Sequence, residues 1–356
     1  MTEKKQAFGK RRVWNKFKKH KLAVGAAGVL ILLYLSAVFA DFLAPYTLNS
    51  EVRYTSYQPP STIYWFDDDG SFAPHIYNMR YTFDEYFNRV FVEEPSQKYY
   101  LRFLNRGERY KFLGLFETDV HLFGVKNGGR FYLCGADEKG RDILSRLFFG
   151  GRISIGLVGS FISLILGMLI GAIAGYYGGF VDGFIMRLCE VIIMVPGFYL
   201  LLALRAALPP ELSSVQIYFG IVFIMSFIAW AGLARIIRGM VLSEARKEYV
   251  LGARCIGVKN IIIIIKHILP NTLSYVIVSV TISIPSYILG ESALSLLGLG
   301  ITDPDASWGN MLTKAMAISE IKYHPWILIP GVFIFLAVIM FNLFGDGLRD
   351  AFDPKT

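Results

Sequence analysis

Residues 153–178 read ISIGLVGSFISLILGMLIGAIAGYYG, and no side chain in this stretch carries a charge. A bilayer core about 30 Å thick takes roughly 20 apolar residues as a helix, because lipid offers no hydrogen-bond partner to exposed backbone groups. The stretch therefore predicts a helix that crosses a membrane. The whole chain of 356 residues agrees, since 54% of its residues are hydrophobic, 18% are charged and its mean hydropathy is +0.46.

Five further apolar segments are long enough to span a bilayer. They are residues 22–44, 186–207, 212–234, 268–290 and 325–345. The segment 186–207 is the least regular, because it includes Arg187, Glu190 and Arg205. We expect Arg187 and Glu190 to pair or to snorkel near a helix end rather than to serve an ion pathway. The chain is therefore predicted to be an all-α polytopic membrane protein with six transmembrane helices.

The basic residues indicate the orientation of the chain. Residues 1–21 hold nine Lys and Arg against one acid, Glu3, which predicts a cytoplasmic tail and an uncleaved signal anchor at 22–44. Six spans return the C-terminus to the cytoplasm and place the loop 235–267, with seven basic and two acidic residues, on the same side. Membrane topology thus accounts for the net charge of +8, and a nucleic-acid partner is excluded.

Residues 45–133, between the first two spans, differ in composition from the rest. Aromatic residues are 22 of the 88 from Tyr46 to Leu133, about 25%, against 15% for the whole chain. Short runs such as RYKFL (109–113) and GRFYL (129–133) predict a small mixed or β-rich extracytoplasmic insertion. Asp67-Asp68-Asp69-Gly70 lacks the spacing of a calcium loop and is interpreted as a solvated acidic turn.

Motifs of catalysis are absent from the sequence. It contains no G-x-x-x-x-G-K-[ST], H-E-x-x-H or G-x-S-x-G. Its three cysteines and five histidines lie in separate segments, without the spacing of metal ligands or of a disulfide framework. We expect no catalytic residue, metal or cofactor on this chain.

The loop 235–267 is long and regularly punctuated. The run EARKEYVLGARCIG (244–257) predicts a short amphipathic helix that ends at a glycine, followed by a second helix stopped by Pro270. A helix at a membrane surface either docks on a partner, lies on anionic lipid or packs as a connector.

The spacing of this loop resembles the EAA loop of ATP-binding-cassette (ABC) importer permeases. The matching residues are Glu248-Tyr249-Val250, Leu251-Gly252-Ala253, Gly257 and Ile268-Leu269-Pro270. Other runs resemble the oligopeptide, dipeptide and nickel branch of that family: GADEKGRDILSR (135–146), GESALSLLGLG (290–300), SWGNM (307–311), NLFGDGLRD (342–350) and Asp353-Pro354. The chain is similar to the second-permease type of the branch, with a permease core at residues 134–356.

The resemblance implies half of a translocation pathway for importing oligopeptides or dipeptides. The implied partners are a second homologous permease, two ATP-binding subunits that carry ATP and Mg²⁺, and an extracytoplasmic solute-binding protein. The residues implied in coupling to the ATPases are Glu248, Tyr249, Gly252, Ala253, Gly257, Leu269 and Pro270. The residues implied in the outer segment of the family are Asp137, Gly140, Arg141, Asp142, Glu291 and Trp308. The expected location is the inner (cytoplasmic) membrane of a bacterium or archaeon.

Some features depart from the family pattern or leave alternatives open. Leu251 stands where the EAA core has glutamate, and Ala136 replaces the usual threonine. One face of the helix 268–290 carries Ser279, Ser283 and Ser286, which either line a polar path for the peptide backbone or make helix-packing contacts. Oligosaccharide or nickel-chelate cargo is an alternative within the same class. An ion-coupled secondary transporter is a rival function, but it needs acids near the membrane midplane, of which the predicted spans carry few.

Overall fold

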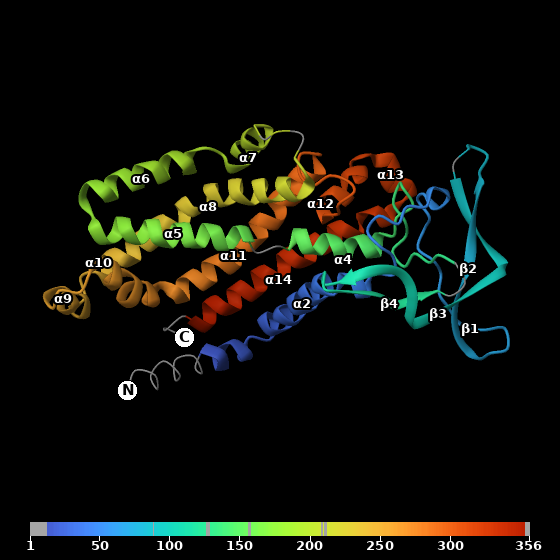
Figure 1. Cartoon of the computed structure of the whole chain (residues 1–356), viewed down its shortest axis with the longest axis horizontal. Coiled ribbons are helices and arrows are strands. Elements are labelled where there is room, and N and C mark those ends of the chain that lie inside the picture. The colour runs from blue at the N-terminus through green and yellow to red at the C-terminus, as the bar shows by residue number, and fades with distance from the viewer. Residues whose placement is uncertain are drawn as a thin grey trace. The chain divides into compact units, whose positions relative to one another are not determined.

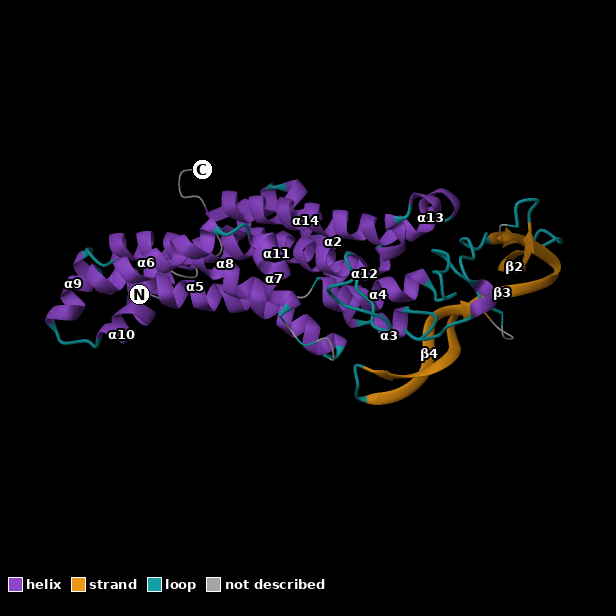
Figure 2. Ribbon diagram, turned by 90° about the horizontal axis from the view of Figure 1, so that it is seen from above, coloured by secondary structure: helices purple, strands orange, loops and turns teal. Residues whose placement is uncertain are grey.

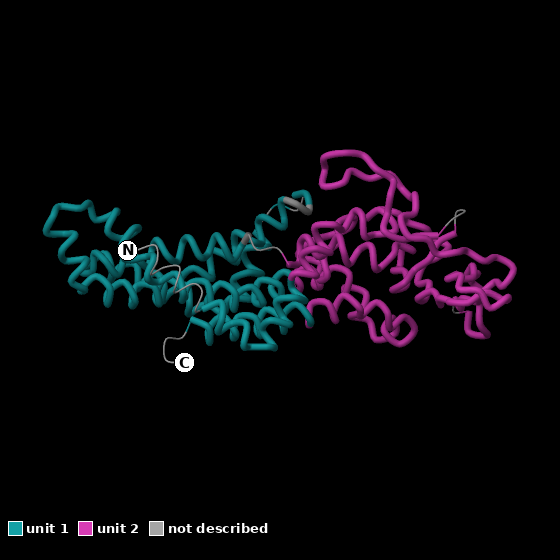
Figure 3. Tube along the Cα trace, turned by 90° about the horizontal axis from the view of Figure 1, so that it is seen from below, with its two compact units in different colours: residues 1–30, 156–291, 336–356 teal, residues 31–155, 292–335 magenta. Residues whose placement is uncertain are grey.

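The computed structural model describes residues 13–87, 89–125, 129–155, 158–207, 209 and 212–352. The first twelve residues of the predicted basic tail and the terminal Asp353-Pro354 lie outside this range. The chain divides into two compact units, which Figure 3 colours separately. Unit 1 contains residues 1–30, 156–291 and 336–356, and unit 2 contains residues 31–155 and 292–335.

The described part of unit 1 is built from helices (Figure 1). The longer ones are α5 (Val158–Tyr177), α6 (Gly179–Met194), α7 (Gly197–Ala206), α8 (Ser214–Glu244) and most of α11 (Leu269–Leu296). Between α8 and α11 lie α9 (Glu248–Cys255), α10 (Asn260–Ile262) and a π-helical segment (Ile263–Ile268). Unit 1 also includes the helical residues 13–19, the first part of α2 (Lys21–Val38) and the last part of α14 (Ile329–Phe352).

Helices α5 and α8 lie side by side because α5 presents a glycine at every fourth position, Gly167, Gly171 and Gly175 (Figure 2). A Cβ added to Gly171 would lie 2.9 Å from Cα of Ala234, and one on Gly175 would lie 2.6 Å from the carbonyl oxygen of Arg238. Small residues at this spacing let membrane helices approach each other backbone to backbone. A larger side chain at either position would push the two helices apart.

The segment predicted as one helix, 186–207, differs in the structure. It forms two helices, α6 and α7, which are bent by 86° at a short break. The break is at Pro196, whose ring disfavours helical backbone in the preceding residue, and Val195 is accordingly extended (φ −79°, ψ 126°). The predicted pairing within this segment is confirmed, since Arg187 donates to Glu190 at 2.8 Å. Of the described helices, five are long and apolar enough to cross a membrane, or six if α6 and α7 make one broken span.

Several helix ends also differ from those predicted. The span predicted at 153–178 is preceded by α4 (Ile143–Ser154), α8 continues past residue 234 to Glu244, and α11 continues past residue 290 to Leu296. The loop predicted at 235–267 therefore begins only after Glu244. The observed helices are longer than the predicted spans because a helix can extend beyond its apolar run, wherever packing and capping support the extra turns.

Pro270 does not stop a helix, contrary to the prediction. The π-helical segment leads directly into α11, and the N–H of Leu269 donates to the carbonyl of Ile264. Proline lacks an N–H, so it is tolerated in the first turn of a helix. The π-helical turn before Pro270 lets the chain pass from α10 into α11 without a break.

Unit 2 confirms the predicted β-rich insertion. Its four-stranded antiparallel sheet has the order β1-β2-β3-β4, with β1 at Tyr64–Phe66, β2 at Phe72–Phe83, β3 at Arg89–Phe112 and β4 at Phe116–Val125 (Figure 2). The first half of the long β3 pairs with β2 and its second half pairs with β4. The helical part of unit 2 includes α3 (Ala40–Leu43), α4, α12 (Trp308–Met311), α13 (Ile318–Tyr323) and the first part of α14.

The acidic run Asp67 to Gly70 forms the turn between β1 and β2. Lys98 of β3 binds this turn, with its Nζ 2.8 Å from Asp67 and 2.5 Å from Asp68. The predicted solvated turn is confirmed at Asp68, Asp69 and Gly70, which are exposed, whereas the Asp67 side chain, paired with Lys98, is only 20% exposed. Across the part of the chain that the structure describes, no cluster of three or more His, Cys, Asp or Glu is arranged to hold a metal ion.

Candidate functional site

The short helix predicted in the loop 235–267 is α9, and one of its faces is buried in unit 1. Val250 is fully buried and Ala253 is 8% exposed. They belong to one apolar cluster with Ile237 and Val241 of α8 and Ile263 of the π-helical segment. Burying apolar side chains on both neighbours holds α9 firmly against the helices on either side of it.

The other face of α9 is open. Glu248 lies in its first turn, and the exposed residues also include Leu251, Gly252 and Ile256. Leu251 is 46% exposed, Ile256 is 81% exposed, and a Cβ added to Gly252 would meet no atom within 4 Å. Exposed apolar side chains next to a charged helix start suit contact with another protein.

Gly257 ends α9 by its backbone conformation. Its φ is +77°, a region that residues with a Cβ rarely adopt. The N–H of Gly257 donates to the carbonyl of Arg254, and the N–H of Val258 donates to that of Ala253, which together make a Schellman motif. A Cβ at Gly257 would meet no atom within 4 Å, so the requirement for glycine here comes from φ and not from space.

A network of hydrogen bonds joins the start of α9 to α8 and α11. The Tyr249 hydroxyl donates to Glu244 at the end of α8 (2.5 Å) and accepts from Asn271 Nδ2 at the start of α11 (2.8 Å). Lys247 also donates to Glu244, at 2.5 Å. Partial burial and the adjacent Glu244 carboxylate raise the pKa of Tyr249 to about 12. Sequence reasoning found Tyr249 but missed Glu244 and Asn271, which lie just outside the matched motifs.

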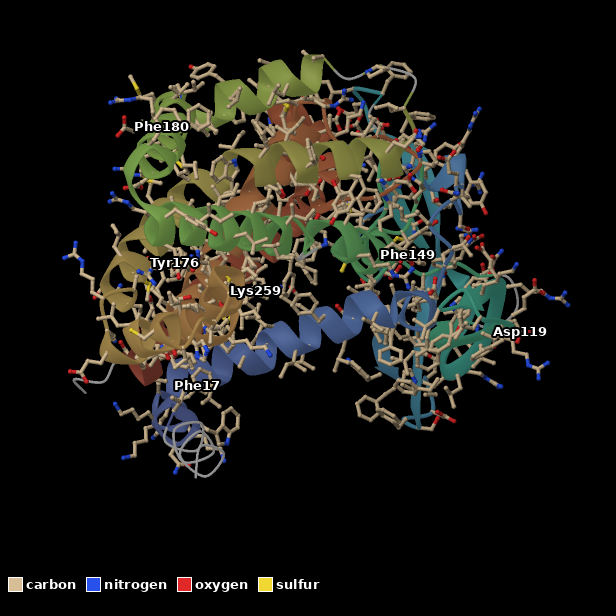
Figure 4. All side chains as sticks on the ribbon, turned by 60° about the vertical axis from the view of Figure 1, so that its left-hand side comes forward. Phe17, Asp119, Phe149, Tyr176, Phe180 and Lys259 are labelled. Carbon is tan, nitrogen blue, oxygen red and sulfur yellow. The ribbon has the colours of Figure 1, made fainter. Side chains whose placement is uncertain are left out.

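A second contact joins the end of α9 to α5. Arg254 Nε donates to the hydroxyl of Tyr176 (3.0 Å), and that hydroxyl donates to Oδ1 of Asn260 at the start of α10 (2.8 Å). Figure 4 labels Tyr176 near the end of α5 and Lys259 just before α10. No motif in the sequence signals this contact, because its partners are 78 and 84 residues apart.

The remaining residues implied in coupling and transport lie in or next to α11. Leu269 is 7% exposed and belongs to the same apolar cluster as Val250, whereas Pro270 is exposed. Along α11, Ser279 and Ser283 are partly buried and Ser286 is exposed. The Ser283 hydroxyl donates to the carbonyl of Val280 in its own helix (2.8 Å), a common way for serine to satisfy its hydroxyl inside a membrane.

The outer family segment forms an ion cluster in unit 2. Arg141 donates to Asp137 (2.7 Å) and, with both terminal nitrogens, to Asp303 (2.9 and 3.3 Å). Arg146 and Lys139 also reach Asp303, at 3.2 and 3.0 Å. Burial favours the neutral acid, but hydrogen bonds from Arg141 and Lys139 outweigh it and lower the pKa of Asp303. Asp303 was missed because it lies between two matched motifs, at positions 290–300 and 307–311.

Two residues of the same segment shape the chain before α4. Gly140 has φ +72°, and a Cβ there would clash with the carbonyl of Val52. Asp142 caps α4, because its Oδ2 accepts from the N–H of Ser145 at 2.8 Å. Complete burial raises the pKa of the Asp142 carboxyl to about 6.

Trp308 anchors α12 on α4 within unit 2. Its indole Nε1 donates to the carbonyl of Leu147 (2.9 Å), and its backbone N–H donates to Ser154 Oγ (2.9 Å). The structure therefore brings Asp137, Gly140, Arg141, Asp142 and Trp308 into one unit. Glu291, the last residue implied in this segment, belongs to unit 1, where it is 5% exposed.

Two family models match the chain. Residues 167–356 match the binding-protein-dependent transport system inner membrane component. Residues 10–60 match the N-terminal transmembrane domain of oligopeptide transport permease C. Together the two models cover helix α2, the loop that carries α9 and the helices that follow it.

Relatives of similar sequence are transport permeases. The chain is 31% identical to the dipeptide transport system permease protein DppC of Bacillus subtilis over 345 residues, 96% of this chain and 84% of that protein. It is 43% identical to the oligopeptide transport system permease protein OppC of Haemophilus influenzae over 228 residues, 63% and 71% of the two chains. It is 33% identical to the glutathione transport system permease protein GsiD of Escherichia coli over 344 residues, 96% and 89%. The resemblance found in the motifs is thus confirmed, and the chain belongs to the family of binding-protein-dependent transport system inner membrane components, as a multi-pass permease subunit of an ABC importer.

Proposed function

We propose that this permease subunit imports oligopeptides or dipeptides and forms half of their pathway, with a second homologous permease forming the other half. Two ATP-binding subunits, which carry ATP and Mg²⁺, and an extracytoplasmic solute-binding protein complete the transporter. Peptide cargo is favoured over oligosaccharide or a nickel chelate, because the similar relatives are named for dipeptide, oligopeptide and glutathione transport.

The observation that carries the mechanism is the placement of α9. One face of α9 is buried against α8 and the π-helical segment, and the other is open to a partner. Closure of the ATP-binding subunits would push on Glu248, Leu251 and Ile256. The hydrogen-bond network at Tyr249 would transmit that displacement to α8 and α11, and the contact at Arg254 would transmit it to α5. Helices joined in this way move as rigid bodies, which is how an alternating-access pathway opens to one side and then the other.

The proposed topology has six spans, with α6 and α7 counted as one broken span. Both termini and α9 lie in the cytoplasm, and residues 45–133 lie outside the inner membrane of a bacterium or archaeon. The nine basic residues of segment 1–21 support this orientation. A reporter that is active only in the periplasm, attached to residue 70 or to the C-terminus, tests this orientation. Activity from the C-terminal fusion would show the opposite orientation.

Two further assignments belong to the same proposal. Ser279, Ser283 and Ser286 line the peptide path, since they fall on one side of α11. Their replacement by leucine should slow uptake in a normally assembled complex, and unchanged uptake would assign these serines to helix packing.

The aromatic insertion 45–133 seats the solute-binding protein or caps the outer mouth. Its deletion should weaken the affinity for the binding protein, and unchanged affinity with full uptake would remove that role.

The decisive test isolates the complex. The chain is expressed with its neighbouring genes, purified in mild detergent and examined by mass spectrometry, and uptake is measured in proteoliposomes with ATP. Recovery of a second permease and ATP-binding subunits, with ATP-dependent uptake of peptides, is the expected result. A homo-oligomer without ATP-binding subunits, whose uptake collapses with the ion gradient, would replace the proposal by an ion-coupled secondary transporter.

A further inference from the structure

An apolar groove in unit 2 separates the end of the first membrane helix from the β3–β4 hairpin. Its volume is about 890 Å³. The helical wall includes Leu32, Leu35 and Phe39, and the hairpin wall includes Phe112, Phe116 and Val120. The two walls meet where the rings of Phe39 and Phe112 stack, with their centroids 6.0 Å apart. None of the lining residues belongs to the coupling contacts or the ion cluster described above.

The hairpin that forms one wall is apolar on one side only. In its register Tyr110 pairs with Thr118 and Phe112 pairs with Phe116, and all four line the groove. Lys111 pairs with Glu117 between them, and these two side chains are exposed. Successive residues of a strand point to opposite faces, so the hairpin turns an apolar face to the helix and a charged face to water.

The few polar side chains that line the groove are already engaged with the backbone. The Tyr110 hydroxyl donates to the carbonyl of Val120 (2.6 Å), and the Ser36 hydroxyl donates to that of Leu33 (2.8 Å). Thr118 Oγ1 accepts from the N–H of Val120 (3.3 Å). A peptide or a sugar in the groove would lose its hydrogen bonds to water without finding replacements. The lining therefore selects an occupant that is itself apolar.

The groove continues the surface of a membrane-spanning helix. Helix α2 is long and apolar enough to cross a bilayer, with a mean hydropathy of 2.0 over its length. Leu32 and Leu35 in its last turns are 66% and 45% exposed. Side chains of this kind on a spanning helix are covered by lipid chains, and the groove opens directly from them.

We propose that the groove binds an acyl chain of a membrane lipid, from the leaflet that adjoins the C-terminal end of α2. The chain fills the space between α2 and the hairpin, and it holds the apolar face of the insertion at the membrane surface. Phe116, which is 57% exposed, and Leu115, which is 80% exposed at the hairpin tip, then lie among lipid and not in water. This inference depends on α2 spanning the membrane and is independent of the cargo.

A matched pair of spin labels tests the occupant in the assembled transporter in lipid nanodiscs. Native Cys134, Cys189 and Cys255 are first replaced by serine. Thr118→Cys then places a label in the groove, and Glu117→Cys places the control label on the opposite face of the same strand. Relaxation of each label is measured with oxygen, which concentrates in lipid, and with a water-soluble nickel chelate.

Oxygen should relax the label at position 118 more than nickel does, and the order should reverse at position 117. A label at 118 relaxed mainly by nickel would mean a water-filled groove and would overturn the proposal. A label at 118 reached by neither reagent would mean that a protein segment of a partner fills the groove, which also overturns it. The neighbouring pair Val120→Cys and Asp119→Cys repeats the comparison if the first pair disturbs the hairpin.

Discussion

The guanidinium of Arg254 lies 4.4 Å from the centre of the Tyr176 ring, and its Nε donates a hydrogen bond of 3.0 Å to the hydroxyl of the same tyrosine. Tyr176 lies in the last turn of α5, and Arg254 in the last turn of α9. A cation over an aromatic face, combined with a hydrogen bond, holds both position and angle. This contact therefore links the end of α9 directly to the end of α5, without α8 as an intermediate.

Removing the Tyr176 hydroxyl should weaken this link while leaving the ring in place. Tyr176→Phe loses two hydrogen bonds, together worth about 2 kcal/mol, so the uptake achieved per ATP hydrolysed should fall, by up to roughly 30-fold. The ratio is measured in proteoliposomes by counting transported peptide and released phosphate. Lys259→Ala, in the same loop but outside the contact, serves as control and should keep the wild-type ratio. Wild-type ratios in both variants would mean that α5 is driven by another route.

The backbone of Gly257 predicts a graded series of substitutions. Gly257→Val forces a β-branched residue to φ +77° and should cost at least 1–2 kcal/mol, which shortens or tilts α9 and uncouples ATP hydrolysis from uptake. Gly257→Asn should be milder, because asparagine tolerates this conformation. Both variants are compared by basal and peptide-stimulated ATPase activity. Equal effects of Val and Asn would show that size at this position matters, and not φ.

The open face of α9 predicts that Gly252 accepts a small side chain and rejects a large one. Gly252→Ala should stabilise α9 by about 1 kcal/mol and leave transport intact, since no atom lies near the added methyl group. Gly252→Trp should release the ATP-binding subunits if this face docks on them. Co-purification of those subunits with each variant is the measurement, and retention by the Trp variant would exclude docking through this face.

Charge at the start of α9 is expected to matter for docking and little for folding. Glu248 lies in the first turn, where a negative charge favours the helix by about 0.3–1 kcal/mol. Glu248→Lys should therefore leave the melting temperature of the complex nearly unchanged and reduce coupling strongly. Glu248→Gln separates the two effects, because it removes the charge without reversing it. Normal coupling in Glu248→Lys would refute a role for this carboxylate.

The ion cluster of unit 2 should depend on Asp303. Asp303→Asn leaves the buried Arg141 and Arg146 with one fewer counter-charge, and we expect a loss of about 1–3 kcal/mol, since Asp303 itself is partly exposed to solvent. The melting temperature of the purified complex should fall. Asp305→Asn, two residues away and outside the cluster, is the matched control. Equal melting temperatures for the two variants would show that the cluster contributes little to stability.

The buried cap Asp142 predicts a pH dependence. Its pKa of about 6 in the folded protein lies above the value of about 3.9 in an unfolded chain. The folded state therefore binds more protons between these values, and the contribution of Asp142 to stability, on the order of 3 kcal/mol, is full below about pH 4 and lost as the pH rises through about 6. Among the described residues Asp142 Oδ1 is buried without a hydrogen-bond partner, and an oxygen in such a place costs more to bury charged than neutral.

Comparison with Asp142→Asn isolates that contribution from other titrating groups. Asparagine still accepts from the N–H of Ser145 but does not titrate, so the difference in melting temperature between wild type and variant should change between about pH 4 and pH 6. A constant difference across this range would mean that Asp142 is charged throughout.

The sequence predicted helix α9 closely and the contacts around it poorly. The run around Val250 and Gly257 has a local period and a local stop signal, so a helix that ends at a glycine could be read from it directly. The prediction that Pro270 stops a helix was wrong, because the π-helical turn before it leads the chain into α11 without a break. The β-rich insertion was predicted from its aromatic runs, although its strand ends and register were not, since these depend on pairing between distant segments.

Composition and local spacing were enough to determine that this chain is a polytopic membrane protein of the importer permease family. Lipid forces a long apolar run into a helix whatever surrounds it, and the family motifs are short enough to be read in order along the chain. The tertiary structure alone decided which side chains meet. Arg254 with Tyr176, Asp303 with Arg141 and Phe39 with Phe112 are pairs whose partners are 73 or more residues apart. Local periodicity does not predict such pairs, because their members are brought together by the packing of whole helices and hairpins.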